Sequence, residues 1–525
     1  MLDFKALPVR QGKNQHSFRC TVNYQDFWCT FKILKMEDTM AMDNENSVNA
    51  SEVYSNIHYD PREIHIFRIE SKNLAFKSST LEIYQLDEMA YEFLTSPKTA
   101  IEKYSLTEIS DLYAALLKLG FFDSLKDDKI DNLSSVNASQ PISQLMMIVS
   151  QDCNLNCIYC LADKGAFYKR HTPMPPEIGI KSIDFLMHES GDAKICLVSF
   201  TGGEPLLNFP TIKITVEYGK KMAEKYNKEI LFLLSTNGSV LDDKILQFIK
   251  NYKIYLNLSL DGPPDVQNRC RPFKNGIGSY DIVVKNLKKL LEHYDPDRIL
   301  IRTTITRYNL DMINTAEHFF QLGARRLSFG KAAPNAFCDY RIYGIDPNTA
   351  MGEIYLKNYL NFCKYMVECF MQRPEISFAN MRDIANLHFR LRKPLGCGMG
   401  QYQVAISPNG EIYPCGVFIG LQNYLMGNLN QGFSRNCQSK YHQIISNRRK
   451  ICNVCWARNI CGGGCHAGDL LDDYKPISEI VCNFAQRVLE INLFAYAYLV
   501  DLVGYEYLNK RLAKYRAERT SAEGT

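Results

Sequence analysis

Three cysteines that lie close together are the residues best suited to chemistry. Cys153, Cys157 and Cys160 fall in the run CNLNCIYC, with a C-x3-C-x2-C spacing directly after the apolar run LMMIVS. Three thiolates on one loop can hold three irons of a 4Fe-4S cluster, which leaves the fourth iron open for a small ligand. Thiolates also suit zinc, but zinc prefers paired C-x2-C units, and this segment has no fourth Cys or His nearby. The spacing therefore favours an iron-sulfur cluster.

This spacing resembles that of the radical SAM enzymes, in which S-adenosylmethionine (SAM) binds the open iron. The resemblance implies an enzyme that reductively cleaves SAM to methionine and a 5'-deoxyadenosyl radical, which abstracts hydrogen from a substrate. It also places the ring of Tyr159, just before the third cysteine, beside the adenine. Ordinary packing near the cluster is the alternative for Tyr159.

The composition is that of a globular protein with several domains. The chain has 525 residues, too many for one core, and a formal net charge of only +4,. We therefore expect neither a nucleic-acid partner nor a membrane partner. The start lacks a signal-peptide pattern, and the late apolar stretch INLFAYAYLVDLVGYEYL is short for a membrane span,. Eighteen cysteines without an export signal predict metal clusters in a reducing cytoplasm,.

Apolar runs alternate with amphipathic segments through the central half of the chain. Continuous apolar runs separated by helix-like segments predict a parallel sheet. Six such units predict an α/β fold, a partial (β/α)6 barrel over residues 141–345. The predicted strands are residues 145–150, 194–200, 229–235, 254–260, 299–305 and 325–330.

Such barrels place their active sites in the loops after the carboxyl ends of the strands. The string TGGEP, after the second predicted strand, resembles the Gly-Gly-Glu-Pro motif of radical SAM enzymes, whose glycines let a backbone edge approach the SAM amine. A strand-to-helix turn or a hydrogen bond at the barrel mouth is the alternative for each residue. By position, the resemblance assigns SAM contacts to Gly202, Gly203, Glu204, Ser235, Asn237, Ser259, Asp261 and Arg302, with Arg302 toward the SAM carboxylate,.

A second set of cysteines lies near the C-terminus. Its spacing, including the Gly-rich CGGGC, resembles the seven-cysteine SPASM domain of many peptide-modifying radical SAM enzymes. A zinc ribbon is the alternative for a C-x2-C pair beside CGGGC. The resemblance implies two auxiliary clusters, and so three 4Fe-4S clusters in all. It assigns Cys397, Cys415 and Cys465 to the first auxiliary cluster, and Cys452, Cys455, Cys461 and Cys482 to the second.

The first auxiliary set has only three cysteines under this assignment. Some members of the family supply a fourth shortly before the position of Cys397, where this chain has RLRKPLG. Either Cys363, Cys369 or Cys437 completes the set, or one iron stays open. An open iron would accept a substrate Cys thiolate, as in thioether-forming relatives.

The region before the barrel suggests a peptide substrate. Residues 61–140 alternate like a short β-meander and then become helical,. They resemble the winged-helix-like module that opens maturases of ribosomally made peptides and that binds a leader peptide at a sheet edge. A simple cap on the barrel is the alternative. The other predicted segments are a hairpin with a polar insertion (1–60), a helical bridge (346–394), a SPASM domain (395–490) and a C-terminal helix and tail (491–525).

Together these features predict a peptide maturase that resembles the SCIFF and ranthipeptide type. It would install thioether crosslinks, from Cys sulfur to carbon, in a Cys-containing precursor peptide or small protein. The resemblance implies an external reductant such as flavodoxin or ferredoxin. Three alternatives remain open: a formylglycine-forming anaerobic sulfatase maturase, a carbon-carbon crosslinking maturase, and a non-catalytic iron-sulfur or zinc scaffold.

Overall fold

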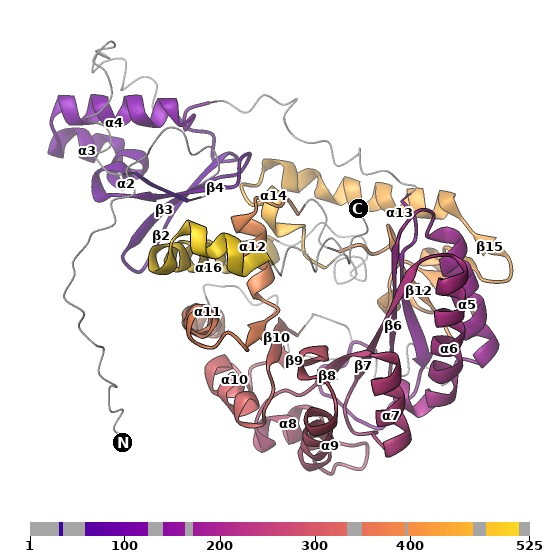
Figure 1. Cartoon of the computed structure of the whole chain (residues 1–525). Helices are drawn as coiled ribbons and strands as arrows, with labels where there is room; N and C mark the ends of the chain where they lie inside the picture. The colour runs from indigo at the N-terminus through magenta and orange to yellow at the C-terminus, as the bar shows by residue number, and fades with distance from the viewer. Residues whose placement is uncertain are drawn as a thin grey trace.

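The chain folds around one large curved sheet, with a smaller module beside it (Figure 1). The computed structural model describes residues 58–123, 140–162, 172–332, 349–393, 397–465 and 479–513, together with the backbone of residues 31–34. The large sheet has eleven strands in the order β11-β10-β9-β8-β7-β6-β5-β12-β13-β14-β15.

Six parallel strands in chain order form the centre of this sheet. All six predicted strands are confirmed, each within two residues at either end. They are β5 (Gln144–Ser150), β6 (Ile195–Gly202), β7 (Glu229–Thr236), β8 (Tyr255–Ser259), β9 (Ile299–Ile305) and β10 (Arg326–Lys331). Helices cover the convex side (Figure 1): α5 (Pro176–Glu189), α6 (Phe209–Lys225), α7 (Asp243–Tyr252), α8 (Pro264–Cys270), α9 (Tyr280–His293) and α10 (Met312–Gln321).

The two faces of the barrel strands differ in exposure. In β7, Ile230, Phe232 and Leu234 are buried, whereas Leu233 and Ser235, which alternate with them, are half-exposed. Because successive side chains of a strand point to opposite faces, the exposed set lines the concave side of the sheet. The predicted partial barrel is thus confirmed, and the more exposed side chains of its strands lie on the concave face.

The second cysteine region continues the same sheet. Strand β12 (Gln403–Ile406) pairs in parallel with β5, and it is followed by β13 (Glu411–Tyr413), β14 (Gly427–Asn428) and β15 (Gly432–Phe433). At the other end β11 (Ser377–Phe378) pairs with β10. The barrel and the second cysteine region therefore form one continuous hydrogen-bonded sheet.

The helices of the predicted bridge pack against the last long helix of the chain. Helix α11 (Ala350–Gln372) and α12 (Met381–His388) lie in the predicted bridge and pack against α16 (Glu479–Val503). The predicted boundary between residues 490 and 491 is wrong, because α16 continues through it. Among the described residues, no single helix meets the length and hydropathy of a bilayer span, and only α16 taken with Tyr505–Ala513, bent by 113°, passes by length and composition.

The small N-terminal module is a sheet covered by helices. Strands β2 (Ile64–Ile69), β3 (Lys72–Lys77) and β4 (Glu82–Leu86) form an antiparallel meander. Helices α2 (Glu88–Thr95), α3 (Pro97–Lys103) and α4 (Leu106–Lys118) follow and share a separate core with it. A fourth strand, β1 (Phe31–Leu34), pairs in parallel with β4. Of the predicted segment 1–60, residues 1–30 and 35–57, which hold most of the predicted hairpin and the polar insertion, lie outside the described residues.

Candidate functional site

The cysteine loop begins where β5 ends. Cys153 is buried, and Cys157 and Cys160 are half-buried. The amide of Leu155 donates to Cys153 Sγ at 3.4 Å, and Asn237 Nδ2 donates to the same sulfur at 3.7 Å. Burial raises the pKa of the Cys157 thiol to about 12. A bound metal would offset that desolvation, because a coordinating thiol is deprotonated outright.

The donor set of the cysteine loop suits an iron-sulfur cluster, because it consists of three thiols on one short segment,. Among the described residues, no group of three or more His, Cys, Asp or Glu is arranged to hold one metal ion. A tetrahedral zinc site needs its sulfurs about 2.3 Å from one point. An iron-sulfur cluster spreads its thiolates over several irons.

Gly202 and Gly203 allow the cysteine loop to lie directly against the end of β6. The Gly203 amide donates to Ser150 O and the Glu204 amide to Asp152 O, both at 2.8 Å. A Cβ on Gly202 would lie 2.2 Å from Ser150 O, and one on Gly203 would lie 2.1 Å from Asp152 O. Gly202 also has a φ of +135°. Glycine is therefore required at both positions by the approach of the loop backbone.

Glu204 faces into the protein. Its side chain is fully buried, and its carboxylate accepts hydrogen bonds from Leu206 N (3.0 Å), Thr236 Oγ1 (2.8 Å) and Asn237 N (2.7 Å). Burial raises its pKa, and these hydrogen bonds act in the opposite direction. The carboxylate thus ties the end of β6 to the end of β7, which is a positioning role.

Asn237 links the same strand end to the cluster loop. Besides its contact with Cys153, its Nδ2 donates to Asn154 Oδ1 at 2.9 Å. Its Oδ1 accepts from Ser239 N and Ser239 Oγ, at 2.9 and 2.6 Å. The side chain is 5% exposed. Like Glu204, Asn237 holds the loop in place.

Three of the predicted SAM-contacting residues lie on the concave face. Ser235 and Ser259 are half-exposed, and Arg302 is exposed on β9. Ser259 and Arg302 are direct neighbours in the register of β8 and β9. These side chains are available to a ligand held in front of the cysteine loop.

Tyr159 and Asp261 are brought together with a residue that the motif analysis missed, Arg271. The Tyr159 hydroxyl donates to Asp261 Oδ2 at 2.5 Å and accepts from Arg271 Nη1 at 2.7 Å. Asp261 Oδ1 accepts from Thr304 N at 3.0 Å. All three partners are buried, and burial raises the pKa of Asp261 while the Arg271 charge opposes that rise.

Arg271 also acts on the cysteine loop. Its charge lowers the pKa of Cys157 against the larger effect of burial, and its Nε has no hydrogen-bond partner among the described residues. The available sequence signal was weak, a lone Arg in the string CRPF that follows the short helix α8.

Thiols of the second cysteine set affect one another's pKa values. Burial raises the pKa of Cys415 to about 12, and the next-largest contributions from other thiols come from Cys465 and Cys397. Cys455 likewise has Cys461 as a charged neighbour. Cys452 and Cys482 are half-buried in the same region, between 449 and the first turn of α16.

The candidates for a fourth ligand of the first set are placed differently. Cys363 and Cys369 are buried on α11, where they hydrogen-bond to Tyr359 and Tyr365. Cys437 is half-buried in the first turn of α13 (Arg435–Arg448). The two α11 cysteines are thus core residues.

Family models match both cysteine regions. Residues 147–320 match the radical SAM superfamily, and residues 397–457 match the SPASM iron-sulfur cluster-binding domain. These matches agree with the partial barrel and the cysteine loop at the end of β5, and they identify a radical SAM region followed by a SPASM region. SAM and 4Fe-4S clusters are the cofactors typical of radical SAM enzymes with a SPASM domain.

Several characterised and uncharacterised proteins are similar to the chain. An uncharacterized protein, MJ0907 of Methanocaldococcus jannaschii, is 31% identical over 37% of this chain and 64% of its own length. The radical SAM cyclopropyl synthase TigE of Paramaledivibacter caminithermalis is 25% identical over 41% of this chain and 48% of its own length. The chain thus spans less than two thirds of either relative.

A sulfatase-maturating enzyme is matched over nearly its whole length. The cysteine-type anaerobic sulfatase-maturating enzyme of Clostridium perfringens (strain 13 / Type A) is 24% identical over 69% of this chain and 98% of its own length. The solved structure of native anSMEcpe with bound AdoMet and Cp18Cys peptide covers 69% of this chain and 99% of its own, with a TM-score of 0.56 and 20% identity. The fold is shared with that structure.

We expect Gly203→Ala to disrupt the cysteine loop, because its Cβ would overlap a backbone carbonyl that has no room to move. The expected cost is about 2 kcal/mol or more, with a lower unfolding temperature and less bound iron after anaerobic reconstitution. Gly330→Ala is the matched control, because a Cβ there meets nothing within 4 Å. Equal iron content in the two variants would contradict the close-approach argument.

Replacing Arg271 with Met leaves Asp261 buried without its counter-charge. We expect a loss of about 3–5 kcal/mol, measured as a drop in the unfolding temperature, with part recovered when Asp261→Asn is added. Arg269→Met is the control, because that side chain is exposed and lies over the Tyr308 ring at 4.9 Å. A double variant no more stable than Arg271→Met would show that the two charges are not coupled.

Proposed function

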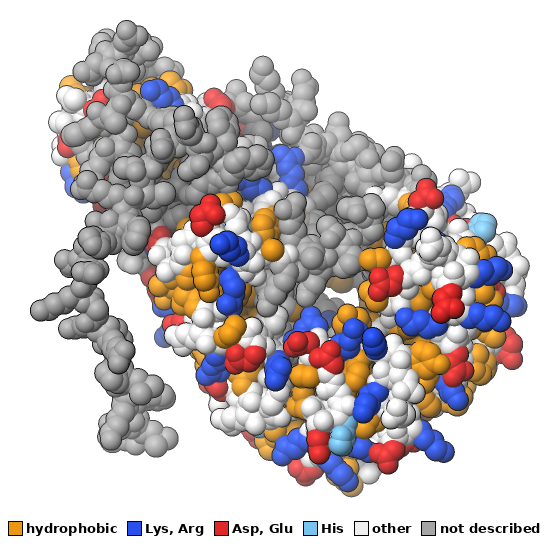
Figure 2. Space-filling model, in the orientation of Figure 1, with side chains coloured by type: hydrophobic (Ala, Val, Ile, Leu, Met, Phe, Trp, Pro, Cys, Tyr) orange, Lys and Arg blue, Asp and Glu red, His pale blue; other side chains and the backbone are white. Residues whose placement is uncertain are grey.

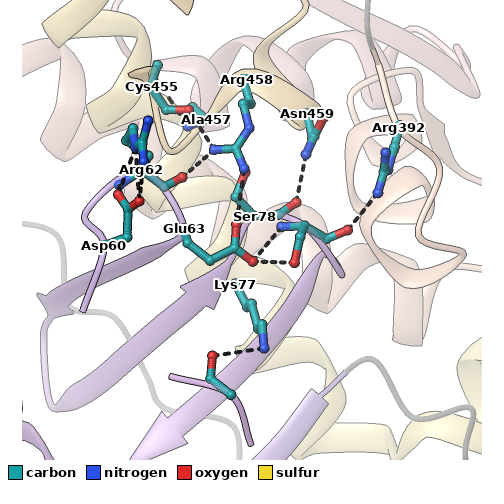
Figure 3. A network of polar contacts seen from close by, with 12 residues as sticks. Asp60, Arg62, Glu63, Lys77, Ser78, Arg392, Cys455, Ala457, Arg458 and Asn459 are labelled. Atoms are coloured by element: carbon teal, nitrogen blue, oxygen red, sulfur yellow. Dashed lines mark hydrogen bonds and ion pairs between the residues drawn. The ribbon is translucent and has the colours of Figure 1, made fainter. Parts of the chain in front are cut away.

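We propose that this chain is a peptide maturase that forms thioether crosslinks between Cys sulfur and carbon in a ribosomally made precursor. The observation that carries the proposal is the attachment of the N-terminal module to the segment that holds the second cysteine set. Residues such as Cys455 and Arg458 of that segment lie against the sheet of the module (Figure 3).

The attachment is built from buried polar contacts. Arg458 Nη2 forms an ion pair with Glu63 at 3.0 Å, with side chains 11% and 4% exposed, and Arg458 also donates to Arg62 O. Asn459 Nδ2 donates to Ser78 O at 2.8 Å (Figure 3).

Rings and a second ion pair extend this interface. The His65 ring of β2 stacks on Trp456 with centroids 3.8 Å apart, and His65 Nε2 contacts Glu490 of α16 at 2.9 Å. Cys455 comes directly before Trp456. A peptide bound to the module would therefore be delivered close to the second cysteine set.

A pocket lies between this set and the barrel. Its volume is about 390 Å³, and its lining includes Lys331 at the end of β10, Tyr355 of α11, Asn492 of α16, and Cys461 and Cys465. Burial lowers the pKa of Lys331 to about 8. The pocket offers room for side chains of a peptide between the barrel mouth and the SPASM region.

The proposed ligands follow the predicted division. Cys153, Cys157 and Cys160 hold the SAM-binding cluster. The seven cysteines of the second set hold the two auxiliary clusters: Cys397, Cys415 and Cys465 the first, and Cys452, Cys455, Cys461 and Cys482 the second. When bound, SAM and the clusters would supply a radical that removes one hydrogen atom from a substrate carbon, and they would accept the electron left over when the deprotonated substrate thiol bonds to that carbon.

The chain's own residues hold and orient these groups. Gly202 and Gly203 would present a backbone edge to bound SAM, and Arg302, Ser235 and Ser259 would face it from the concave side. Arg271 places a positive charge beside the cysteine loop. The partial barrel keeps the reacting carbon away from bulk water.

The proposed partners are a Cys-containing precursor peptide and a cytoplasmic reductant such as flavodoxin or ferredoxin. A peptide substrate is consistent with the structure of anSMEcpe, which was solved with a bound peptide. On the face in Figure 2, Lys and Arg side chains are interspersed with Asp and Glu over the described barrel helices. Such mixed charge supports neither a nucleic-acid nor a membrane partner.

A formylglycine-forming maturase is the second candidate. The C. perfringens sulfatase-maturating enzyme is matched over 98% of its length by only 69% of this chain. The remaining third of this chain has no counterpart in that alignment. This difference favours a substrate recognised through an extra module.

We expect a short Cys-rich peptide encoded beside this gene, co-expressed anaerobically with the chain, to lose about two hydrogens (2 Da) per crosslink by mass spectrometry. Its linked cysteines should resist thiol alkylation. A formylglycine product would instead lose the Cys sulfur, and a carbon-carbon crosslink would keep every thiol alkylatable. Either result would overturn the thioether proposal.

Cysteine variants separate the proposed clusters in the same experiment. Cys153→Ala should abolish 5'-deoxyadenosine formation from SAM, because the SAM-binding iron is lost. Cys452→Ala should preserve SAM cleavage and lose the crosslinked product. Cys196→Ala is a matched control, because Cys196 is buried on β6 and belongs to neither set. Normal product from Cys452→Ala would exclude the auxiliary role.

Arg458→Met should loosen the N-terminal module, because Glu63 would stay buried without its partner. We expect a loss of about 3–5 kcal/mol at this interface, faster hydrogen exchange in β2 and β3, and unchanged SAM cleavage without peptide. Lys103→Met is the control, since its pair with Glu92 is exposed to solvent and such surface pairs contribute little to stability,. Unchanged exchange in Arg458→Met would show that other contacts hold the module.

A further inference from the structure

Tyr441 on α13 has a buried hydroxyl that the rest of the mechanism does not use. The side chain is 4% exposed, and its hydroxyl has no hydrogen-bond partner within the described ranges. Leaving a buried hydroxyl without a partner costs about 1–3 kcal/mol. The position therefore suggests an acceptor other than the described side chains.

The Tyr441 ring lies beside the segments that carry two cysteines of the first auxiliary set. A Cβ on Gly400, three residues after Cys397, would lie 2.6 Å from the ring and 3.3 Å from Cβ of Pro414, which directly precedes Cys415. Burial raises the pKa of Tyr441 most, and the next contributions come from Cys397, Cys415 and Cys465 in that order. These contributions agree with the packing around Gly400.

The ring is held in place by its surroundings. A Cβ on Gly400, which has a φ of +71°, would lie 2.6 Å from two Tyr441 ring carbons, so only glycine leaves room for the ring. Phe418 packs against it edge-on with centroids 6.5 Å apart. On the same helix, Gln438 Nε2 donates to Gln401 O at 2.8 Å. These contacts thus fix the position of the Tyr441 ring.

We infer that the Tyr441 hydroxyl donates a hydrogen bond to a sulfur of the cluster held by Cys397, Cys415 and Cys465, and thereby raises its reduction potential. The inference rests on the proposed auxiliary cluster. A phenol O–H is a donor, and thiolate and sulfide sulfurs are acceptors. Because reduction adds negative charge to the cluster, a donor stabilises the reduced state more than the oxidised state.

The experiment is an anaerobic redox titration of the full chain, followed by electron paramagnetic resonance. Cys153→Ala, Cys157→Ala and Cys160→Ala are combined as the background, so that only auxiliary clusters titrate. Adding Tyr441→Phe should shift one cluster about fivefold toward the oxidised form at a fixed potential. For a one-electron couple this is a fall of about 40 mV.

Tyr424→Phe is the matched control, because Tyr424 stacks on Phe418 at 4.3 Å and loses the same hydroxyl. Its potentials should equal those of the background. An unchanged potential in Tyr441→Phe would overturn the inference. Loss of about four irons from Tyr441→Phe would overturn it in another way, by showing that the phenol is an iron ligand.

The iron content of a Cys397→Ala variant distinguishes a failure of the proposed auxiliary cluster from a failure of this inference. If Cys397→Ala keeps the full iron content of the background, no cluster is held at the first set, and the auxiliary assignment is wrong. If Cys397→Ala loses about four irons while Tyr441→Phe keeps its potential, the cluster stands and only the role of Tyr441 falls.

Discussion

The backbone contact between the cysteine loop and the end of β6 fixes the candidate active site. Ser150 and Asp152 accept hydrogen bonds from consecutive amides after Gly202, at a distance that excludes a side chain. The chain then turns so that Glu204 meets the end of β7, where Asn237 reaches back to Cys153. The ends of β5, β6 and β7 are thereby held together, and these contacts also fix the position of the cysteine loop.

Much of the fold could be predicted because each signal was local. The barrel strands are apolar runs that end in polar or glycine-rich strings, and the cysteine sets have distinctive spacings. Features that depend on distant pairing were missed. Arg271 bonds to Tyr159, 112 positions away, and β12 is a four-residue strand whose partner β5 lies far earlier in the chain. The spacing of apolar and polar residues along the chain does not indicate which distant residues pair.

Motif resemblance identified residues that the structure brings to the barrel mouth, and their contacts with SAM stay predictions. The side chains of Glu204, Asn237 and Asp261 also bond to other parts of the barrel mouth. Ser235 and Arg302 remain accessible from the concave side. A motif specifies chemical groups, whereas burial and hydrogen-bond partners decide what those groups contact.

The strand β1 changes how a peptide can meet the N-terminal module. Residues 31–34 already pair with β4, from Phe31 opposite Ile83 to Leu34 opposite Leu86, and β2 at the other edge lies against α16. A peptide that pairs with β4 must therefore replace a strand of the same chain. Its apparent affinity is reduced by the fraction of molecules in which β1 occupies the edge. Because β1 is tethered, its local concentration is high, and the module would select peptides by competition between two strands.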